Sequence, residues 1–462
     1  MSNPEVSYRS DALDIFRGIA ILMMVFSGVI PRELLSDWMY HAQLPPPGHG
    51  FNPELVGLTW VDLVFPMFLF AMGAAMPFSL SKKLKQNDSM WKTAGQIFYR
   101  GFLLFVFAVF LQHIRPWNIS SESQNLSWFL ALAGFVVLML IYTDWNRHVN
   151  LIKSRILTAS GWIGAVLMMF FIPFENPAHF SLNRSDIIIL ILANMAVICA
   201  FLWLITRNNL RLKMVSIAIV AAIMIGGSVS GWVQDFQQNA TVFWLFRWDF
   251  LYYAILVLAG TMAGEIIQAK KDQLQEKAEQ ISLFQMLAAL VLVIVLVMGY
   301  QERWEMTPWI ALAGSVLLLV NSRNNKSTVF AQMGQLAAGF LVVGALVEPW
   351  QAGIKKDPTT LSYLLITAGI SFLILMILIY LFDQKRISFS RSFLIANGRN
   401  PMVAYVAFGN LLLPAMSLLS LSPYINQFLS GAALGTLRGA LYTLGAGLIT
   451  QFFTSKKLYW KT

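Results

Sequence analysis

The chain has 462 residues, of which 57% are apolar and only 12% are charged, and its formal net charge is +10. An ordinary soluble domain has about 25% charged residues, so this composition cannot supply the polar surface that a soluble protein of this length needs. It predicts a polytopic membrane protein and excludes a cytosolic enzyme, a secreted domain and a DNA-binding protein. The single cysteine, Cys199, excludes a disulfide framework within the chain and a multi-cysteine metal site.

Apolar runs of about 20 residues, the length that crosses a bilayer core, recur along the whole chain. We therefore expect an all-α fold with about 14 transmembrane helices, within a range of about 10–14. The first run is interpreted as a retained helix, because Asp14 and Arg17 lie at its start and it lacks a small-residue cleavage site. The expected spans are 11–31, 59–81, 95–113, 126–143, 155–173, 185–206, 213–232, 246–268, 281–299, 307–321, 327–348, 361–383, 392–418 and 431–453.

The positive charges indicate an orientation for these spans. With the N-terminus inside, 22 Lys and Arg residues fall on the cytoplasmic side and 7 on the outer side. This asymmetry follows the positive-inside rule and predicts that both termini are cytoplasmic. It also explains most of the basic charge without a nucleic-acid partner. Aromatic residues near the span ends fit interfacial anchoring: Trp117, Trp304, Trp309, Trp350 and Trp460.

Charged residues at the start of the first span form the first candidate site, because polar groups in or beside membrane spans are costly and often functional. Asp14 and Arg17 are three residues apart, so they share one face of a helix. One interpretation is an interfacial ion pair that fixes the entry of the helix. The other is a cytoplasmic-side site for an anionic cofactor, with Arg17 facing a phosphate.

The loop between the first two spans forms the second candidate site. It holds two of the five histidines, His41 and His49, around three consecutive prolines that stiffen it. Asp62 follows, about one turn into the next span. A histidine oriented by a carboxylate is a common general base; the alternative is two surface histidines and a structural Asp that caps the helix. We expect no metal, because two histidines without an evident third ligand are a weak signal.

A polar stretch that interrupts the span at 392–418 forms the third candidate site. Gly398 and Pro401 predict a broken helix, which a membrane protein tolerates where the backbone lines a cavity. Arg399, at this break beside Asn400, would suit a phosphate or a buried acid. The alternative is a loop at the membrane surface. Elsewhere, close helix packing is expected at three small residues, Gly260, Ala263 and Gly264.

Several motifs stand at the two ends of the chain. The N-terminal ones are Arg9-Ser-Asp-Ala-Leu-Asp14-Ile-Phe-Arg17-Gly18, then Tyr40-His41-Ala42, then Gly57-Leu-Thr-Trp-Val-Asp62-Leu-Val-Phe-Pro66. The C-terminal ones are Leu361-Ser-Tyr363, Gly398-Arg-Asn400-Pro-Met-Val-Ala-Tyr405 and Lys456-Lys-Leu-Tyr-Trp460-Lys461. Together they resemble the heparan-alpha-glucosaminide N-acetyltransferase family, which includes bacterial relatives.

The resemblance implies an enzyme that carries an acetyl group from cytosolic acetyl-CoA to an amino sugar on the far side of the membrane. A histidine at the non-cytosolic face is essential in that family. By the motif this histidine is His41, and His49 remains its rival. Asp62 matches the acid of the second motif and Asn400 matches the Asn of the late helix. The opening motif is matched by two residues, Asp14 and Arg17.

The resemblance is strong over 9–81 and 355–462 and weaker between them, and the chain departs from the family in two places. The region Val25–Gly28 has no Asn where the eukaryotic member has one, and the loop that holds His41 is longer and proline-rich. We expect one transmembrane acyltransferase domain over 1–462. It consists of N-terminal motif helices with the His-bearing outer loop (9–81), variable middle helices (82–354) and C-terminal motif helices (355–462).

The leading hypothesis is an acetyl-CoA-dependent N- or O-acetyltransferase of a bacterial inner membrane that modifies a sugar on the periplasmic face. His41 would be the base or would itself be acetylated, Asp62 would orient it, and Asn400 or a backbone amide would stabilise the oxyanion. The anionic co-substrate acetyl-CoA would be bound by Asp14, Arg17 and Arg399.

Two other functions are compatible with the composition. A transporter or flippase of a small polar or envelope-glycan substrate is the main alternative, although no matched pair of interrupted helices is evident. A non-catalytic subunit of a polysaccharide-assembly complex is the other. The expected partners are an amino sugar or glycan acceptor and the lipid bilayer, without nucleic acid or metal. A homodimer would follow only by analogy with the eukaryotic relative.

Overall fold

The computed structural model describes residues 10–32, 34–85, 89–120, 123–175, 178–275, 280–323 and 327–461. Within these ranges the chain is helical, with isolated β-bridges and no strand. Twelve helices of the described chain are long and apolar enough to cross a membrane. The predicted all-α polytopic membrane fold is confirmed. Arg9, which opens the first motif, lies outside the described residues.

The helices follow the predicted spans, and every predicted span contains at least one. The first half of the chain contains α1 (Asp11–Ser27), α2 (Trp60–Lys85), α3 (Met90–His113), α4 (Gln124–Tyr142), α5 (Leu151–Phe171), α6 (Ile187–Thr206), α7 (Leu210–Gly227), α8 (Trp232–Asn239), α9 (Trp248–Tyr252) and α10 (Ala254–Ala269). The second half contains α11 (Lys271–Gln275), α12 (Leu283–Gln301), α13 (Thr307–Asn321), α14 (Val329–Val347), α15 (Leu361–Leu378), α16 (Arg391–Arg399), α17 (Pro401–Val406), α18 (Leu413–Leu418), α19 (Leu421–Phe428) and α20 (Gly431–Ser455).

Two of the predicted spans form helices that are shorter than the twelve helices long enough to cross a membrane. Helix α1 has 17 residues and α13 has 15 residues, against the roughly 20 that cross a bilayer core unaided. Helix α1 is nevertheless largely buried among its neighbours, including its acidic residue Asp14. The cytoplasmic placement of both termini stays a prediction.

The predicted break in the late span is confirmed. Helix α16 ends at Arg399 and α17 begins at Pro401, with Asn400 between them in a non-helical conformation. Proline has no N–H to donate and its ring disfavours a helical conformation of the preceding residue. A π-helical turn, η6 (Ala407–Leu412), then leads into α18. The backbone that deviates at this point is buried among other helices, as a membrane environment requires.

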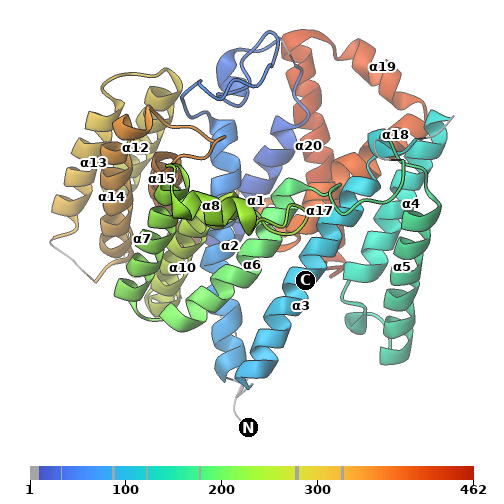
Figure 1. Ribbon diagram of the computed structural model, residues 1–462, viewed down its shortest axis with the longest axis horizontal. Helices are drawn as coiled ribbons and strands as arrows, with labels where there is room; N and C mark the ends of the chain where they lie inside the picture. The colour runs from blue at the N-terminus through green and yellow to red at the C-terminus, as the bar shows by residue number, and fades with distance from the viewer. Residues whose placement is uncertain are drawn as a thin grey trace.

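Helices α1, α2, α10 and α15 form the centre of the molecule, with α12–α14 on one side and α4–α5 on the other (Figure 1). Helix α15 is buried along its whole length. Helices α2 and α10 touch through their backbones, because a Cβ atom on Gly260 would collide with the Phe70 carbonyl and one on Gly73 would collide with the Val257 carbonyl. The predicted small-residue packing is thereby confirmed for Gly260.

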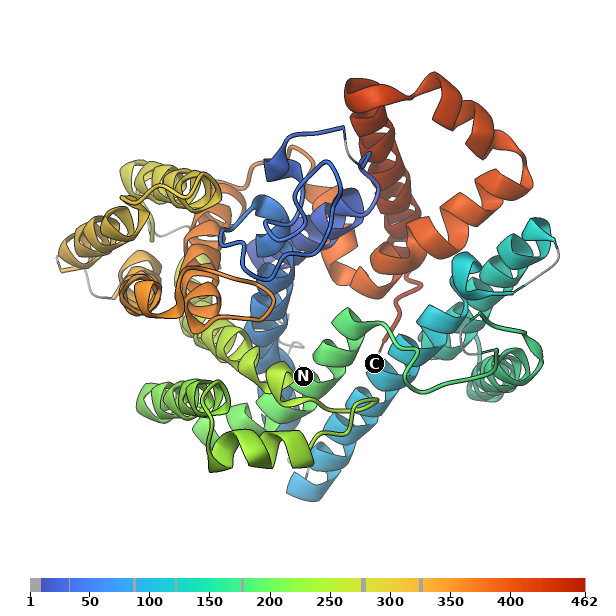
Figure 2. The same cartoon turned by 45° about the horizontal axis from the view of Figure 1, so that its top comes forward.

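The loop that joins α1 to α2 lies over one end of this central group. Figure 2 brings it forward, beside the segment between α14 and α15. The two segments are joined by a backbone hydrogen bond of 2.8 Å from Gly57 N–H to the Ile354 carbonyl. Segments nearly 300 residues apart in sequence therefore form one surface above the central helices.

The α2–α10 contact predicts a specific sensitivity to added volume. Replacing Gly260 by Ala forces the two backbones apart, and we expect it to destabilise the protein by about 1–3 kcal/mol. The measurement is thermal unfolding of the purified protein in detergent. Gly339→Ala is the matched control, because a Cβ atom at this glycine of α14 meets nothing within 4 Å. Equal unfolding temperatures for the two variants would contradict the close contact.

Candidate active site

A buried carboxylate and a partly exposed imidazole form the centre of the site. The Nδ1 atom of His41 lies 2.6 Å from Oδ1 of Asp62, whose side chain is only 2% exposed. The other carboxylate oxygen accepts hydrogen bonds from Ala42 N–H at 3.1 Å and from Thr59 N–H at 3.2 Å. Because Asp62 fixes the proton of the imidazole on Nδ1, Nε2 is left as the basic nitrogen.

The loop that carries His41 is held by side chains at several points. The Tyr40 hydroxyl donates to the Pro31 carbonyl at 2.7 Å, and the Thr59 hydroxyl donates to the Tyr40 carbonyl at 2.7 Å. Gln43 bonds the backbone of Asp357, accepting from its N–H at 2.9 Å. Because these bonds lie on both sides of His41, they fix the position of its imidazole ring relative to α2.

Lys356 is a third charged group at this centre. Its Nζ atom lies 3.1 Å from Nδ1 and 3.4 Å from Nε2 of His41, and 3.9 Å from Oδ1 of Asp62. Burial lowers the pKa of Lys356, and the carboxylates of Asp62 and Asp357 oppose that shift. No local sequence pattern marks Lys356 as a site residue, since it lies 315 residues after His41.

The structure brings His41, and not His49, to Asp62. The Nδ1 atom of His49 lies 2.9 Å from the Leu44 carbonyl oxygen, and its ring packs edge-on against Tyr40 with the centroids 4.4 Å apart. His49 adopts a left-handed backbone conformation with φ of 46°. It therefore forms part of the loop that supports His41.

His41 opens into a cavity of about 290 Å³, the outer chamber. Its walls combine apolar side chains of α1, α2 and η6 with a few polar groups. Arg115 is one of these; it lies over the ring of Tyr405, whose hydroxyl donates to Asp186 at 2.9 Å. The lining residues are Met24, Val25, Ser27, Gly28, Val29, His41, Val61, Val64, Phe65, Arg115, Trp117, Ile188, Lys356, Tyr405, Phe408 and Gly409.

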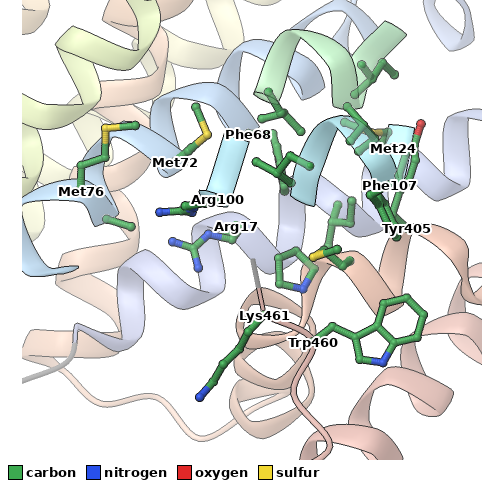
Figure 3. Close-up of a pocket in the computed structure, with 18 of the residues that line it drawn as sticks. Arg17, Met24, Phe68, Met72, Met76, Arg100, Phe107, Tyr405, Trp460 and Lys461 are labelled. Carbon is green, nitrogen blue, oxygen red and sulfur yellow. The ribbon is translucent and has the colours of Figure 1, made fainter. Parts of the chain in front are cut away.

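A second cavity of about 360 Å³, the inner chamber, adjoins the outer one (Figure 3). The two share Met24, Ile188 and Tyr405 in their walls. The inner chamber is lined by cationic residues, which are Arg17, Arg100 and Lys461. Its other walls are mainly apolar, with Phe68, Met72, Met76 and Phe107 among them.

Two donors of the inner chamber are buried without any hydrogen-bond partner in the described part of the chain. They are Nε of Arg100, on α3, and Nε1 of Trp460. Buried donors are almost always paired, so this pair indicates that an acceptor from a ligand completes them. Sequence reasoning missed Arg100 because it stands alone in an apolar span; an isolated arginine inside a predicted span was the available signal.

The remaining predicted residues lie beside the inner chamber or have other partners. Asp14 pairs with Arg399, whose Nε lies 3.1 Å from its Oδ2, whereas Arg17 donates to the Gly398 carbonyl at 3.1 Å. Asp14 and Arg399 thus join α1 to α16, and neither lines the inner chamber. Of the three residues predicted to bind the cofactor, only Arg17 lies in the wall of the inner chamber.

Asn400 is not brought to His41. Its amide donates to the Leu458 carbonyl at 2.9 Å and its carbonyl accepts from Trp460 N–H at 3.1 Å. Asn400 is fully buried and does not line the outer chamber. In this position it fixes the C-terminal segment that carries Trp460 and Lys461 into the inner chamber.

Comparisons with known proteins support the resemblance seen in the motifs. The chain is 34% identical over 104 residues to heparan-alpha-glucosaminide N-acetyltransferase of Homo sapiens and 32% identical over 103 residues to the same enzyme of Mus musculus. Each match covers 22% of this chain and 14% of the length of the relative.

A family model described as a domain of unknown function (DUF5009) matches residues 9–267. The matched range is more than half of the chain and contains His41, Asp62, Arg17 and Arg100, as well as the middle helices up to α10. The protein therefore belongs to the DUF5009 family.

Proposed function

We propose that this protein is a transmembrane acetyltransferase. It takes acetyl-CoA from the cytoplasmic side of a bacterial inner membrane and acetylates an amine or hydroxyl group of a sugar at the periplasmic face. One observation carries the proposal: the His41–Asp62 pair opens into a chamber that adjoins a second, cation-lined chamber. The partial similarity to two N-acetyltransferases supports the same reaction class.

The inner chamber suits the nucleotide end of acetyl-CoA. Phosphates need several charged donors, and guanidinium groups bind them through paired N–H bonds. Arg17, Arg100 and Lys461 line one cavity; Lys461 is paired there with Asp144 at 2.5 Å, whereas the Nε of Arg100 has no described partner and would be completed by a phosphate oxygen. The apolar walls between the two chambers suit the pantetheine arm, so the thioester would lie in the outer chamber.

At the outer chamber His41 acts on the acceptor. Nε2 removes the proton as the acceptor nitrogen or oxygen attacks the thioester carbonyl, and the carbon–sulfur bond of the tetrahedral intermediate then breaks. The proton on Nε2 passes to the departing sulfur, so the products are the acetylated sugar and CoA with a free thiol. Asp62 stabilises the imidazolium that forms in between.

In an alternative route Nε2 of His41 attacks the thioester, the carbon–sulfur bond breaks and CoA leaves as a thiolate. The acceptor then attacks the acetylated His41, and its proton passes to the thiolate as the acetyl–nitrogen bond breaks. Both routes develop negative charge on the former carbonyl oxygen. The ammonium group of Lys356, within 3.4 Å of Nε2, lies where it can stabilise that charge. We therefore assign oxyanion stabilisation to Lys356 and a positioning role to Asn400.

The role of His41 is tested by its replacement with alanine. We expect the His41→Ala variant to bind acetyl-CoA normally and to lose turnover by about 10²–10⁴-fold, the usual contribution of a general base. Binding is measured by calorimetry in detergent, and turnover by thiol release with and without glucosamine. His179→Ala, which alters an exposed histidine of the α5–α6 loop, is the control. Turnover that survives in His41→Ala and is lost in His49→Ala would contradict the assignment.

The inner chamber is tested by Arg100→Gln. Because a hydrogen bond to a charged group contributes about 1.5–3 kcal/mol, we expect the Kd for acetyl-CoA to rise by about 10–100-fold. S-acetylpantetheine, which lacks the nucleotide, should bind the variant and the parent protein equally. The control is Arg155→Gln, at an exposed arginine of α5. An unchanged Kd for acetyl-CoA in Arg100→Gln would contradict binding of the nucleotide in this chamber.

Lys356 predicts an alkaline limit to activity. Only the protonated form of Lys356 stabilises an oxyanion, and burial lowers its pKa. The rate should therefore begin to fall at a pH below about 10.4, the ordinary pKa of a lysine. Lys356→Arg keeps its charge and should move this fall to higher pH, whereas Lys356→Met should be slow at every pH. Lys355→Met, which alters the lysine paired with Glu54, is the control. Identical alkaline profiles for Lys356→Arg and the parent would contradict the role.

A further inference from the structure

A third cavity of about 480 Å³ lies beside the outer loops and takes no part in the proposed reaction. It is formed where α12 ends, α13 begins and α14 meets the turn η4 (Pro349–Gln351). These elements lie outside the residues 9–267 that the family model matches. The side chains that define its chemistry are Tyr300, Arg303, Trp304, Glu305, Trp309 and Glu348.

Several polar groups of this cavity lack partners among the described residues. Tyr300 is 5% exposed, yet its hydroxyl is buried without a hydrogen bond. Glu348 is partly buried, and its carboxylate forms no hydrogen bond or ion pair with any described residue; burial raises the pKa of this carboxyl. Arg303 is exposed and donates from Nε to the Val56 carbonyl at 2.8 Å. The buried, unpaired hydroxyl of Tyr300, with the unpaired carboxylate of Glu348 in the same wall, indicates a polar ligand.

The other prominent groups are aromatic. Trp304 is 44% exposed and Trp309 is 65% exposed, so both rings can receive a ligand. Indole rings offer an apolar face next to a polar rim, and a pyranose ring has the matching form, with C–H groups on its faces and hydroxyl groups around its edge. A phosphate would meet the carboxylates of Glu305 and Glu348, and a purely apolar ligand would leave Tyr300 unsatisfied.

The cavity is separated from the His41 loop by one layer of backbone. Gly57 lines it, and a Cβ atom at Gly57 would lie 3.3 Å from the Tyr300 carbonyl oxygen and 3.5 Å from Cβ of Ala42, the neighbour of His41. Gly57 has φ of 140°, which favours glycine. Ile354, which also lines the cavity, is two residues before Lys356.

We propose that this cavity is a saccharide subsite. It binds one sugar unit of the glycan acceptor, stacked on Trp309 and hydrogen-bonded to Tyr300 and Glu348, beside the loop that carries His41. An amino sugar gains an additional ion pair, because its ammonium group is the natural partner for the Glu348 carboxylate. The inference rests on the proposed function for the identity of the acceptor, and on the cavity itself for sugar binding.

The test measures sugar binding without acetyl-CoA, using the full chain in lipid nanodiscs and a β-1,4-linked glucosamine trisaccharide as the probe. We expect tryptophan fluorescence to report saturable binding that weakens by at least about tenfold, or about 1.4 kcal/mol, in both Trp309→Ala and Glu348→Gln. The matched control is Trp350→Ala, because Trp350 is a comparably exposed tryptophan (67%) in the adjacent turn that does not line the cavity. It should bind like the parent protein.

The outcomes separate this subsite from the acetyltransferase reaction. Acetyl-CoA hydrolysis that depends on His41, together with trisaccharide binding that is absent or unaffected by Trp309→Ala and Glu348→Gln, would overturn the subsite alone. Trisaccharide binding that responds to both variants, without any acetyl-CoA binding, would support the subsite and overturn the proposed reaction. Binding of glycerophosphocholine that displaces the trisaccharide and weakens equally in the two variants would assign the cavity to a lipid headgroup and overturn the proposal.

Discussion

The outer half of the site is organised around the need to satisfy one buried carboxylate, Asp62. A charge that is only 2% exposed at the end of a membrane helix is costly unless its oxygens are bonded. Its partners come from the loop before α2, and Lys356 approaches from the loop before α15. Because the loops must converge on Asp62 to stabilise it, the same contacts orient the imidazole of His41 and place a cation beside its reactive nitrogen.

The cations of the inner half differ in how far the fold itself pairs them, and Lys461, which lines the inner chamber, is paired with Asp144. Arg399 forms an ion pair with Asp14 where α1 meets α16, so its charge is neutralised within the fold. Arg100 lies in an apolar span with a buried Nε that has no described partner. In a low-dielectric interior such a group is tolerable only if something else neutralises it part of the time. A negatively charged ligand in the inner chamber would meet that requirement.

Sequence reasoning succeeded where the chemistry was local and failed where it was not. The break between α16 and α17 is predicted by Gly398 and Pro401, and His41 and Asp62 are only 21 residues apart. Lys356 reaches His41 from 315 residues away, so no spacing could reveal it. The spacing of Asp14 and Arg17 places both on one face of α1, but it could not reveal that Arg399 of α16, from the other end of the chain, pairs with Asp14.

Asn400 illustrates how a residue linked to activity by resemblance can act through another residue. Its side chain uses both its donor and its acceptor on the backbone of Leu458 and Trp460. Asn400 stands at the helix break before Pro401, in a non-helical conformation. Trp460 and Lys461 then enter the wall of the inner chamber. The irregular backbone of the late span therefore positions Trp460 and Lys461 at the inner chamber, whereas His41 lines only the outer chamber.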